Sequence, residues 1–304
     1  MVMIVVAGLF AAHAWLLQRA RPSFAGGLLA IVVALSLFWN AFDYFVRFAN
    51  HPDTFDGFTT GEYEIAAAAR RLAESDAVYL SPWNSESDAQ NHRLLLRDTT
   101  ARGFNTVHCQ MYFPERTNHY LVDTINDFHG TARLAGRFPA GSVTESFEHY
   151  PRTEVFTVPP DSMVEMAIPI QADFGADIAL VGASVWPNAA TRGETLSVTL
   201  AWQARAAVDA NLIALVHVAT DANAVPVVGH DSAPCSGTYP TSTWRAGEVV
   251  FDAHDIQLPE DITVGTYRIY VGLYSWPEQV RLPPKAGGTP DGRLEIRSFE
   301  IDAE

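Results

Sequence analysis

One segment in the C-terminal half combines aromatic rings with polar side chains, the two features that a sugar-binding surface needs. Residues 231–244 read Asp-Ser-Ala-Pro-Cys-Ser-Gly-Thr-Tyr-Pro-Thr-Ser-Thr-Trp. Flat rings such as Tyr239 and Trp244 suit the apolar faces of pyranose rings, and a carboxylate such as Asp231 accepts hydrogen bonds from sugar hydroxyls. The candidate glycan-binding residues are Asp231, Tyr239, Trp244, Asp252 and His217.

The same residues admit other interpretations. In the one that the pattern favours, Trp244 closes one end of a β-sandwich while Asp231 and Asp252 cap turns. A hydrolase site built from Asp231, Asp252 and His217 is weaker, because the chain lacks a nucleophile motif such as G-x-S-x-G. The acidic residues, with Asp255, also lack the order of a calcium loop. We therefore assign no catalytic residue, no metal ligand and no cofactor.

Charge and motif spacing argue against nucleotide or nucleic-acid binding. The net charge is -15, and residues 1–47 carry +2, which leaves -17 for residues 48–304. Such a surface repels phosphate backbones. The turn at 81–87, after the first predicted strand, has no glycine-rich phosphate cradle, and the histidines of residues 50–160 form no H-x-x-x-H or H-E-x-x-H pair. We expect no nucleic-acid partner.

Two apolar stretches near the N-terminus predict membrane-spanning helices. Residues 2–17 contain no charge, and residues 24–42 repeat the pattern at greater length. At about 1.5 Å per residue, the second stretch covers a hydrocarbon core of roughly 30 Å, whereas the first is marginal. The hairpin 18–23 carries two arginines, and short basic loops stay in the cytoplasm. We expect the lipid bilayer as a partner and residues from about 48 onward outside the cytoplasm.

A cleaved signal peptide is the competing interpretation of residues 1–17. It is weakened because no basic residue precedes the apolar run. The abrupt apolar start suggests instead that the chain is the tail of a longer polytopic protein.

Two soluble domains are predicted after this helical hairpin of residues 1–48. Strand and helix patterns alternate in residues 49–160, which indicates a small α/β domain. In residues 165–304 the period is two, as in Leu196, Val198, Leu200 and Trp202. Roughly seven or eight such strands between turn residues predict an all-β sandwich, jelly-roll or immunoglobulin-like.

The two cysteines fall in different predicted domains. Cys109 and Cys235 are bridged only if those domains touch, so the sequence favours two unpaired thiols.

The C-terminal part of the chain resembles the C-terminal region of a known protein family. The stretches that carry the likeness are 174–182 (FGADIALVG), 193–202 (GETLSVTLAW), 239–244 (YPTSTW) and 265–274 (GTYRIYVGLY). They look like the extracytoplasmic region of bacterial polytopic glycosyltransferases similar to the dolichyl-phosphate-mannose protein mannosyltransferase family. In that family a small α/β unit and a sandwich follow a bundle of transmembrane helices.

The resemblance implies a role near sugar transfer without supplying a catalytic residue. The family's catalytic carboxylate lies in the first extracytoplasmic loop, and its donor is a lipid-phosphate-linked sugar. This chain has only the short hairpin 18–23 between its predicted helices. The implied function is a non-catalytic accessory region that positions or recognises glycan or polypeptide acceptor, with further transmembrane helices of a glycosyltransferase as a partner. The alternative is a self-standing cell-surface β-sandwich adhesion or interaction protein.

Overall fold

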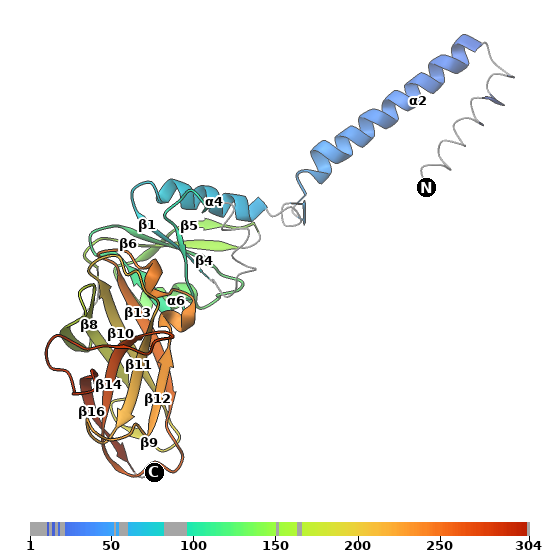
Figure 1. Cartoon of the computed structure of the whole chain (residues 1–304). Helices are drawn as coiled ribbons and strands as arrows, with labels where there is room; N and C mark the ends of the chain where they lie inside the picture. The colour runs from blue at the N-terminus through green and yellow to red at the C-terminus, as the bar shows by residue number, and fades with distance from the viewer. Residues whose placement is uncertain are drawn as a thin grey trace. The chain divides into compact units, whose positions relative to one another are not determined.

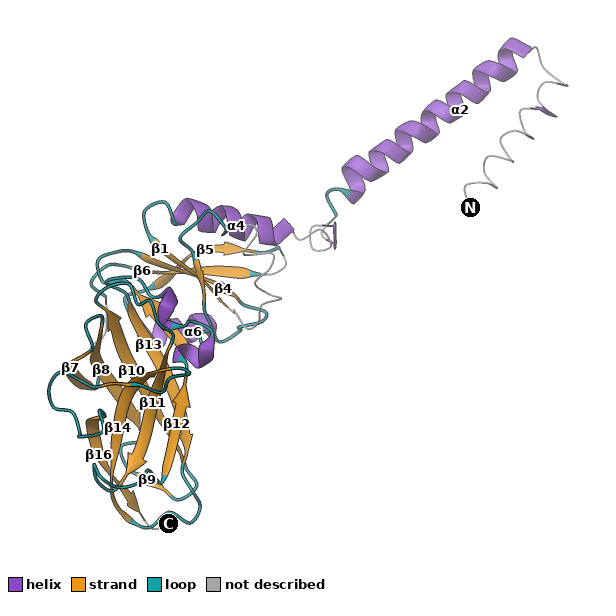
Figure 2. Ribbon diagram, in the orientation of Figure 1, coloured by secondary structure: helices purple, strands orange, loops and turns teal. Residues whose placement is uncertain are grey.

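The computed structural model describes residues 22–51, 53–54, 60–81, 96–149, 152–162 and 166–302, together with 11, 14–15 and 18. The chain divides into two compact units, Met1–Thr60 and Gly61–Glu304 (Figure 1). The first unit is helical where it is described, and the second consists mostly of β-sheet (Figure 2).

The first unit contains one helix that is long and apolar enough to cross a membrane. Helix α2, Pro22–Phe42, runs into the π-helical turn η1, Asp43–Phe48. The segment Gly26–Phe48 has a mean hydropathy of 1.8 and is not buried within the protein. Asp43 and Arg47 form an ion pair of 3.0 Å near its end. The other predicted span, 2–17, lies mostly outside the described residues, so the structure shows one candidate spanning helix.

The second unit begins with a five-stranded sheet in the order β2-β1-β4-β6-β5. The strands β1, β2 and β4 are parallel, whereas β6 and β5 are antiparallel to their neighbours. The mixture agrees with the predicted α/β pattern, although the sequence did not predict β5 and β6. The bounds are β1 Ala77–Ser81, β2 Arg102–Gly103, β4 Asn118–Asp123, β5 Ser142–Phe147 and β6 Thr153–Val158, with helices α4 Thr60–Leu72 and α6 Gly130–Arg137.

The two faces of this sheet pack against different partners. Val78 and Leu80 of β1 form a cluster with the alanine-rich face of α4. Tyr79, between them, points to the opposite face, because side chains alternate along a strand. There it joins Tyr120 and Leu134 of α6 in the larger hydrophobic cluster of the unit. The small sheet thus shares its core with the strands that follow.

Two further sheets, which we call the two-sheet region, enclose most of that larger cluster. One has the order β3-β13-β10-β8-β7, and the other has the order β12-β11-β14-β16-β9 with β15 paired to β14. The bounds are β3 Cys109–Tyr112, β7 Ile168–Phe174, β8 Ile178–Trp186, β9 Ala190–Thr191, β10 Thr195–Ala204, β11 Leu212–Ala219, β12 Val228–Ser232, β13 Val249–Gln257, β14 Gly265–Ser275, β15 Arg281–Leu282 and β16 Leu294–Asp302.

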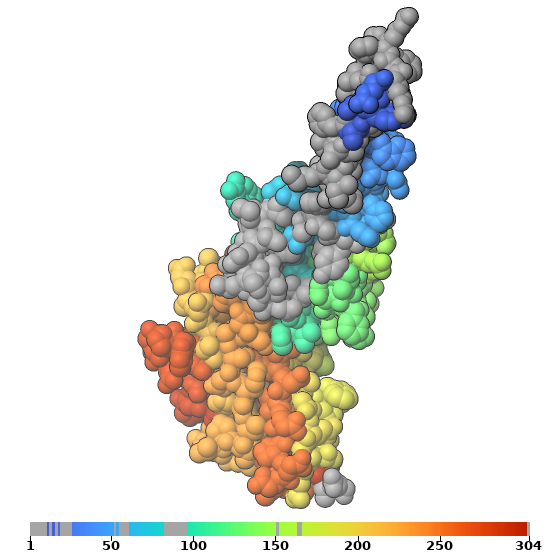
Figure 3. Space-filling view, turned by 90° about the vertical axis from the view of Figure 1, so that its right-hand side faces the viewer, coloured from blue at the N-terminus to red at the C-terminus, as the bar shows by residue number. Residues whose placement is uncertain are grey.

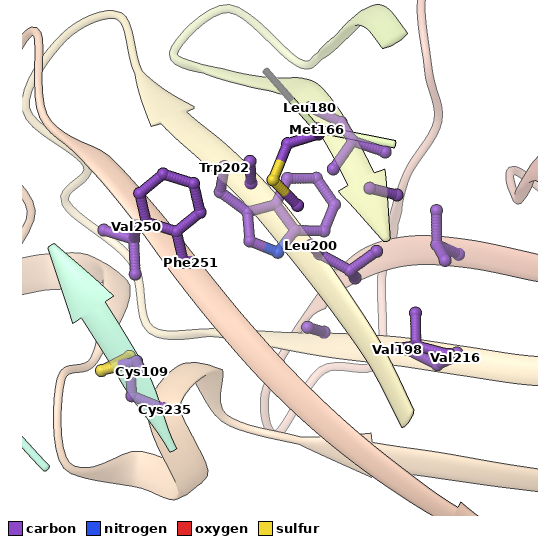
Figure 4. Packing of buried hydrophobic residues seen from close by; sticks show 14 of the residues in the cluster. Cys109, Met166, Leu180, Val198, Leu200, Trp202, Val216, Cys235, Val250 and Phe251 are labelled. Carbon is purple, nitrogen blue, oxygen red and sulfur yellow. A yellow bond between two sulfur atoms is a disulfide. The ribbon is translucent and has the colours of Figure 1, made fainter. Parts of the chain in front are cut away.

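The period of two in β10 is confirmed by its burial. Leu196, Val198, Leu200 and Trp202 are fully buried in the cluster. Figure 4 shows Trp202 near Phe251 of β13, with the disulfide at strand β3.

A strand of the small α/β region completes the two-sheet region. Strand β3 begins at Cys109, within the range 49–160 of the predicted α/β domain, and pairs with β13 in the register Asp252↔Cys109. It therefore forms the edge of a sheet whose other strands all begin at residue 168 or later.

The prediction of unpaired thiols is wrong for this structure. Cys109 and Cys235 form a disulfide with a Cα–Cα distance of 5.0 Å. The pairing with β13 brings the cysteines together across 126 residues, a separation that the sequence pattern does not bridge. Cys235 lies in the short helix η2, Pro234–Gly237.

A buried carboxylate also joins the small sheet to the two-sheet region. Glu248 is fully buried, and its Oε1 atom accepts hydrogen bonds from the hydroxyls of Tyr79 (2.8 Å) and Tyr239 (3.1 Å). The guanidinium of Arg245 pairs with the same atom at 2.8 Å. Burial and the neighbouring Glu248 raise the pKa of Tyr79 well above its usual value, so its hydroxyl stays a donor. Arg245 also donates to the carbonyl of Thr100.

Removing the disulfide should destabilise the second unit. Because the bridge closes a loop of more than a hundred residues, Cys109→Ser combined with Cys235→Ser should lower the free energy of unfolding by about 2–4 kcal/mol. Urea denaturation followed by circular dichroism measures the change. Reducing agent should lower the stability of the parent chain and leave the double variant unaffected; an equal response of both proteins would contradict the bridge.

Replacing Glu248 should be more damaging than replacing a surface glutamate. Glu248→Ala leaves Arg245 and two tyrosine hydroxyls without their acceptor, at a cost of about 3 kcal/mol in the free energy of unfolding. The control Glu300→Ala, at an exposed position of β16, should change it by less than about 0.5 kcal/mol. Equal midpoints for the two variants in urea denaturation would show that the carboxylate does not stabilise the contact between the small sheet and the two-sheet region.

Candidate functional site

The outer face of the β12-β11-β14-β16-β9 sheet carries polar side chains from two adjacent strands. On β11, Val216 and Val218 point into the core, so His217 points outward. Its direct partner on β14 is Tyr270, between the core residues Ile269 and Val271. The pairing of these strands therefore places an imidazole beside a phenol on the face away from the core.

A segment after β14 crosses this outer face, and we call residues 281–293 the crossover segment. It pairs with β14 in the register Tyr274↔Arg281. A Cβ atom built on Gly272 would lie 3.5 Å from the carbonyl oxygen of Gly292, so the chain passes directly over the glycine. In Figure 3 the orange-red residues that follow β14 stand out from the side of the two-sheet region. A turn at its end, in which Arg293 N donates to Thr289 Oγ1 at 3.0 Å, fixes Asp291 and Arg293.

Between the crossover segment and β11 lies a pocket with a volume of about 310 Å³. This is at the lower end of the range of small-molecule sites, roughly 300–1,000 Å³, and suits one small ring. Its polar lining comes from His217, Asn223, Arg281, Asp291 and Arg293, and the other residues of the loop 222–226 supply an apolar wall.

Asp231 fixes the state of the histidine in the pocket. The Nε2 atom of His217 lies 2.9 Å from Oδ1 of Asp231, and Tyr274 also bonds to this carboxylate. Burial raises the pKa of Asp231, but the hydrogen bonds from His217 and Tyr274 and the nearby charge of Arg281 outweigh it and hold the pKa below its usual value. An ionised carboxylate only accepts, so we assign the proton of the neutral imidazole to Nε2. Nδ1, which is buried and has no hydrogen-bond partner among the described residues, is then an acceptor.

Gly229 on β12 gives this histidine room. It stands opposite His217 in the strand register, and an added Cβ would lie only 2.6 Å from Cδ2 of the ring. The absent side chain lets the imidazole lie flat along the neighbouring strand.

The structure brings together only part of the predicted glycan-binding set. His217 and Asp231 are paired, as described above. Tyr239 and Trp244 are 2% and 3% exposed, so they do not form a ring platform open to solvent. Tyr239 bonds to Glu248, and Nε1 of Trp244 donates to the carbonyl of Tyr239 at 3.1 Å. Trp244 packs in the main core cluster, in line with the structural interpretation of this residue.

Asp252 lies in a separate, buried network in the other sheet. Its Oδ1 atom accepts the backbone N–H of Cys235 at 2.7 Å, and its Oδ2 atom lies 2.8 Å from Nε2 of His254. The Nδ1 atom of His254 in turn lies 2.9 Å from Nδ1 of His230. The hydrolase arrangement of Asp252 with His217 and Asp231 is therefore not assembled. Among the residues that the structure describes, no cluster of three or more possible metal ligands is present.

Sequence reasoning missed the two arginines of the pocket. Neither was among the predicted site residues, and Arg293 follows a run of turn residues, Gly-Gly-Thr-Pro-Asp-Gly, at 287–292. That run was the available signal, because such a turn between two strands fixes the residue that ends it.

The fold and the pocket define a mostly β protein with a polar surface site and one candidate membrane-spanning helix. No protein-family model and no curated protein matches the chain. The solved structures that it is similar to include the C-terminal domain of Wzt, at 14% identity over 46% of this chain and 83% of that one, with a TM-score of 0.32. A Niemann-Pick type C2 protein from Japanese carpenter ant is 12% identical over 45% of this chain and 98% of that one, with a TM-score of 0.26.

A third similar structure is a β-glucuronidase from Bacteroides uniformis, at 13% identity over 45% of this chain and 15% of that one, with a TM-score of 0.26. At these TM-scores the likenesses carry no argument about function.

The histidine pair makes stability depend on pH. Burial and the neighbouring His254 lower the pKa of His230, so the unfolded chain binds more protons than the folded chain in the pH range between the folded-state pKa and the unfolded value of about 6.5. The free energy of unfolding should therefore fall as the pH decreases from about 7.5 through the folded-state pKa. Urea denaturation should show a smaller fall for His230→Gln, whereas Ser232→Ala on the same strand keeps the parent dependence. Identical pH profiles for parent and His230→Gln would overturn this assignment.

Proposed function

We propose that the chain is a membrane-anchored, non-catalytic protein that recognises a saccharide outside the cytoplasm, in the pocket between β11 and the crossover segment. The observation that carries the proposal is the unpartnered acceptor of His217 beside the guanidinium groups of Arg281 and Arg293. Sugars present closely spaced hydroxyls that both donate and accept hydrogen bonds. A small polar pocket with an apolar wall matches one such ring.

The remaining parts of the chain support a position at a membrane surface. Helix Gly26–Phe48 has the length and composition of an anchor. The Cys109–Cys235 disulfide favours an oxidising compartment, because such bridges persist mainly outside the cytosol. In this proposal the two-sheet region is a β-sandwich of the jelly-roll or immunoglobulin-like kind, and a second N-terminal helix spans the membrane at residues 2–17.

We further propose that the protein serves a glycosyltransferase-like partner as an accessory region. This part rests on the resemblance of the stretches 174–182, 193–202, 239–244 and 265–274 to the tails of such enzymes. The accessory role fits a recognition pocket without a catalytic constellation among the described residues.

A glycan-array screen of the full chain in detergent tests the recognition. A fragment of residues 165–304 is unsuited, because it lacks β3 and the Tyr79 partner of Glu248. We expect binding to a restricted set of saccharides and a loss of at least about tenfold for His217→Phe, which keeps a ring but removes both nitrogens. The control Arg205→Gln, at a surface ion pair with Asp173 of β7, should bind like the parent.

An absence of binding to every saccharide, by protein with an intact circular dichroism spectrum, would remove the recognition function. That result would favour the alternative of an adhesion or interaction protein, with a protein surface as its ligand.

A further inference from the structure

The guanidinium of Arg293 is buried in the pocket wall with spare hydrogen-bonding capacity. Its side chain is only 4% exposed, and its plane lies over the ring of Tyr270 at 4.8 Å. Nη2 donates to the carbonyl of Ala222 at 2.9 Å, and Nε lies 2.6 Å from Oδ2 of Asp291. The latter contact is an ion pair whose N–H direction falls short of hydrogen-bond geometry. Nη1 has no hydrogen-bond partner in the described part of the chain.

Arg281, which also lines the pocket, has a buried donor without a partner in the described part of the chain as well. It is half-buried, and its guanidinium lies 5.7 Å from the ring centre of Tyr274. Its Nη1 atom is buried without a hydrogen-bond partner, and within the described ranges no carboxylate lies within 4.0 Å of its nitrogens. Leaving a charged donor unsatisfied is costly, so two such donors at one pocket indicate a missing acceptor.

The acceptors of the pocket, by contrast, are already paired. Asp231 accepts from His217 and Tyr274. Asp291 accepts from the hydroxyl of Thr289 at 2.5 Å and pairs with Arg293. Burial raises the pKa of Asp291, but Thr289 and the two arginines outweigh it and hold the pKa below its usual value. Both carboxylates are thus ionised and engaged, so the unmet demand of the site is for an anion and not for a cation.

We propose that the saccharide recognised by this pocket carries an anionic group, a carboxylate or a phosphate, which binds the Nη1 atoms of Arg281 and Arg293. A small rotation of the half-buried Arg281 side chain presents its donor to the pocket. Nδ1 of His217 accepts a hydroxyl of the same ring. The inference rests on the proposed function, because it names the chemical class of the ligand at the same site.

The negative net charge of the protein does not prevent an anion from binding at the pocket. The soluble part carries -17, but the pocket sets two arginines against two carboxylates. Charge-assisted hydrogen bonds to a guanidinium are short and strong, and Arg is suited to planar carboxylates and to phosphates. Selectivity for an acidic sugar over a neutral one therefore arises locally.

Saturation-transfer NMR and calorimetric titration of the full chain in detergent test the inference. The probes are glucuronate, glucose 6-phosphate, glucose and inorganic phosphate, each at constant ionic strength. We expect glucuronate or glucose 6-phosphate to bind at least about tenfold more tightly than glucose, which corresponds to about 1.4 kcal/mol. The comparison of the two acidic probes decides between carboxylate and phosphate.

Variants assign the binding to the arginines. Arg281→Gln keeps a half-buried polar side chain and should weaken the binding of the acidic sugar at least about tenfold, which reduces or abolishes its preference over glucose. Arg205→Gln removes an arginine far along the chain and should leave all titrations unchanged. The comparison of acidic and neutral probes on the parent chain needs no variant, so a folding defect in Arg281→Gln does not remove the test.

The outcomes separate the two proposals. Equal binding of glucose and glucuronate, unaffected by Arg281→Gln, overturns the anionic ligand and leaves saccharide recognition standing. Binding of inorganic phosphate that Arg281→Gln abolishes, with no saccharide bound on the array or in solution, supports the anion site and overturns saccharide recognition. No binding of any of the four probes overturns the anionic ligand, and an array without any bound saccharide in addition overturns both proposals.

Discussion

The buried carboxylate of Glu248 lies at the point where three parts of the second unit meet. It holds a tyrosine of the small parallel sheet, a tyrosine from the connection before β13, and an arginine that reaches the carbonyl of Thr100. A charge without solvent is tolerated only when such donors surround it. With the edge strand β3 and the disulfide, this contact makes the α/β region and the two sheets share one core.

The pocket is a second place where the structure depends on how charged groups are buried. The outer face of a sheet would ordinarily be wet, yet Tyr270 is fully buried there because Arg293 covers its ring. The crossover segment brings both arginines onto this face and buries the Nη1 atom of each. The short pairing of β15 with β14 positions Arg281, and the turn at residues 289–293 positions Arg293. Rigid backbone elements thereby hold polar groups ready for a ligand.

Local patterns predicted much of the strand structure but few of the long-range contacts. The alternation in the first part of β10 was readable because only one face of that strand is buried there. The pairing of Cys109 with Cys235 was not, since it depends on a strand that leaves its own region and joins a distant sheet. Tyr239 and Trp244 have the composition of an exposed sugar platform. The pattern already favoured a structural place for Trp244, whereas the burial of Tyr239 against Glu248 depends on the tertiary fold. Of the predicted site, His217 and Asp231 do meet, whereas the arginines beside them became candidates only through the crossover segment.

The most direct test of the account is nitrogen NMR of the His217 ring in the full chain, with selectively labelled histidine and assignment by His217→Phe. The account predicts a neutral ring with its proton on Nε2, facing Asp231, and a change in the Nδ1 signal when glucuronate is added. The signals of the buried His254 should not move. A proton on Nδ1, or a glucuronate response absent from His217, would contradict the proposed binding mode.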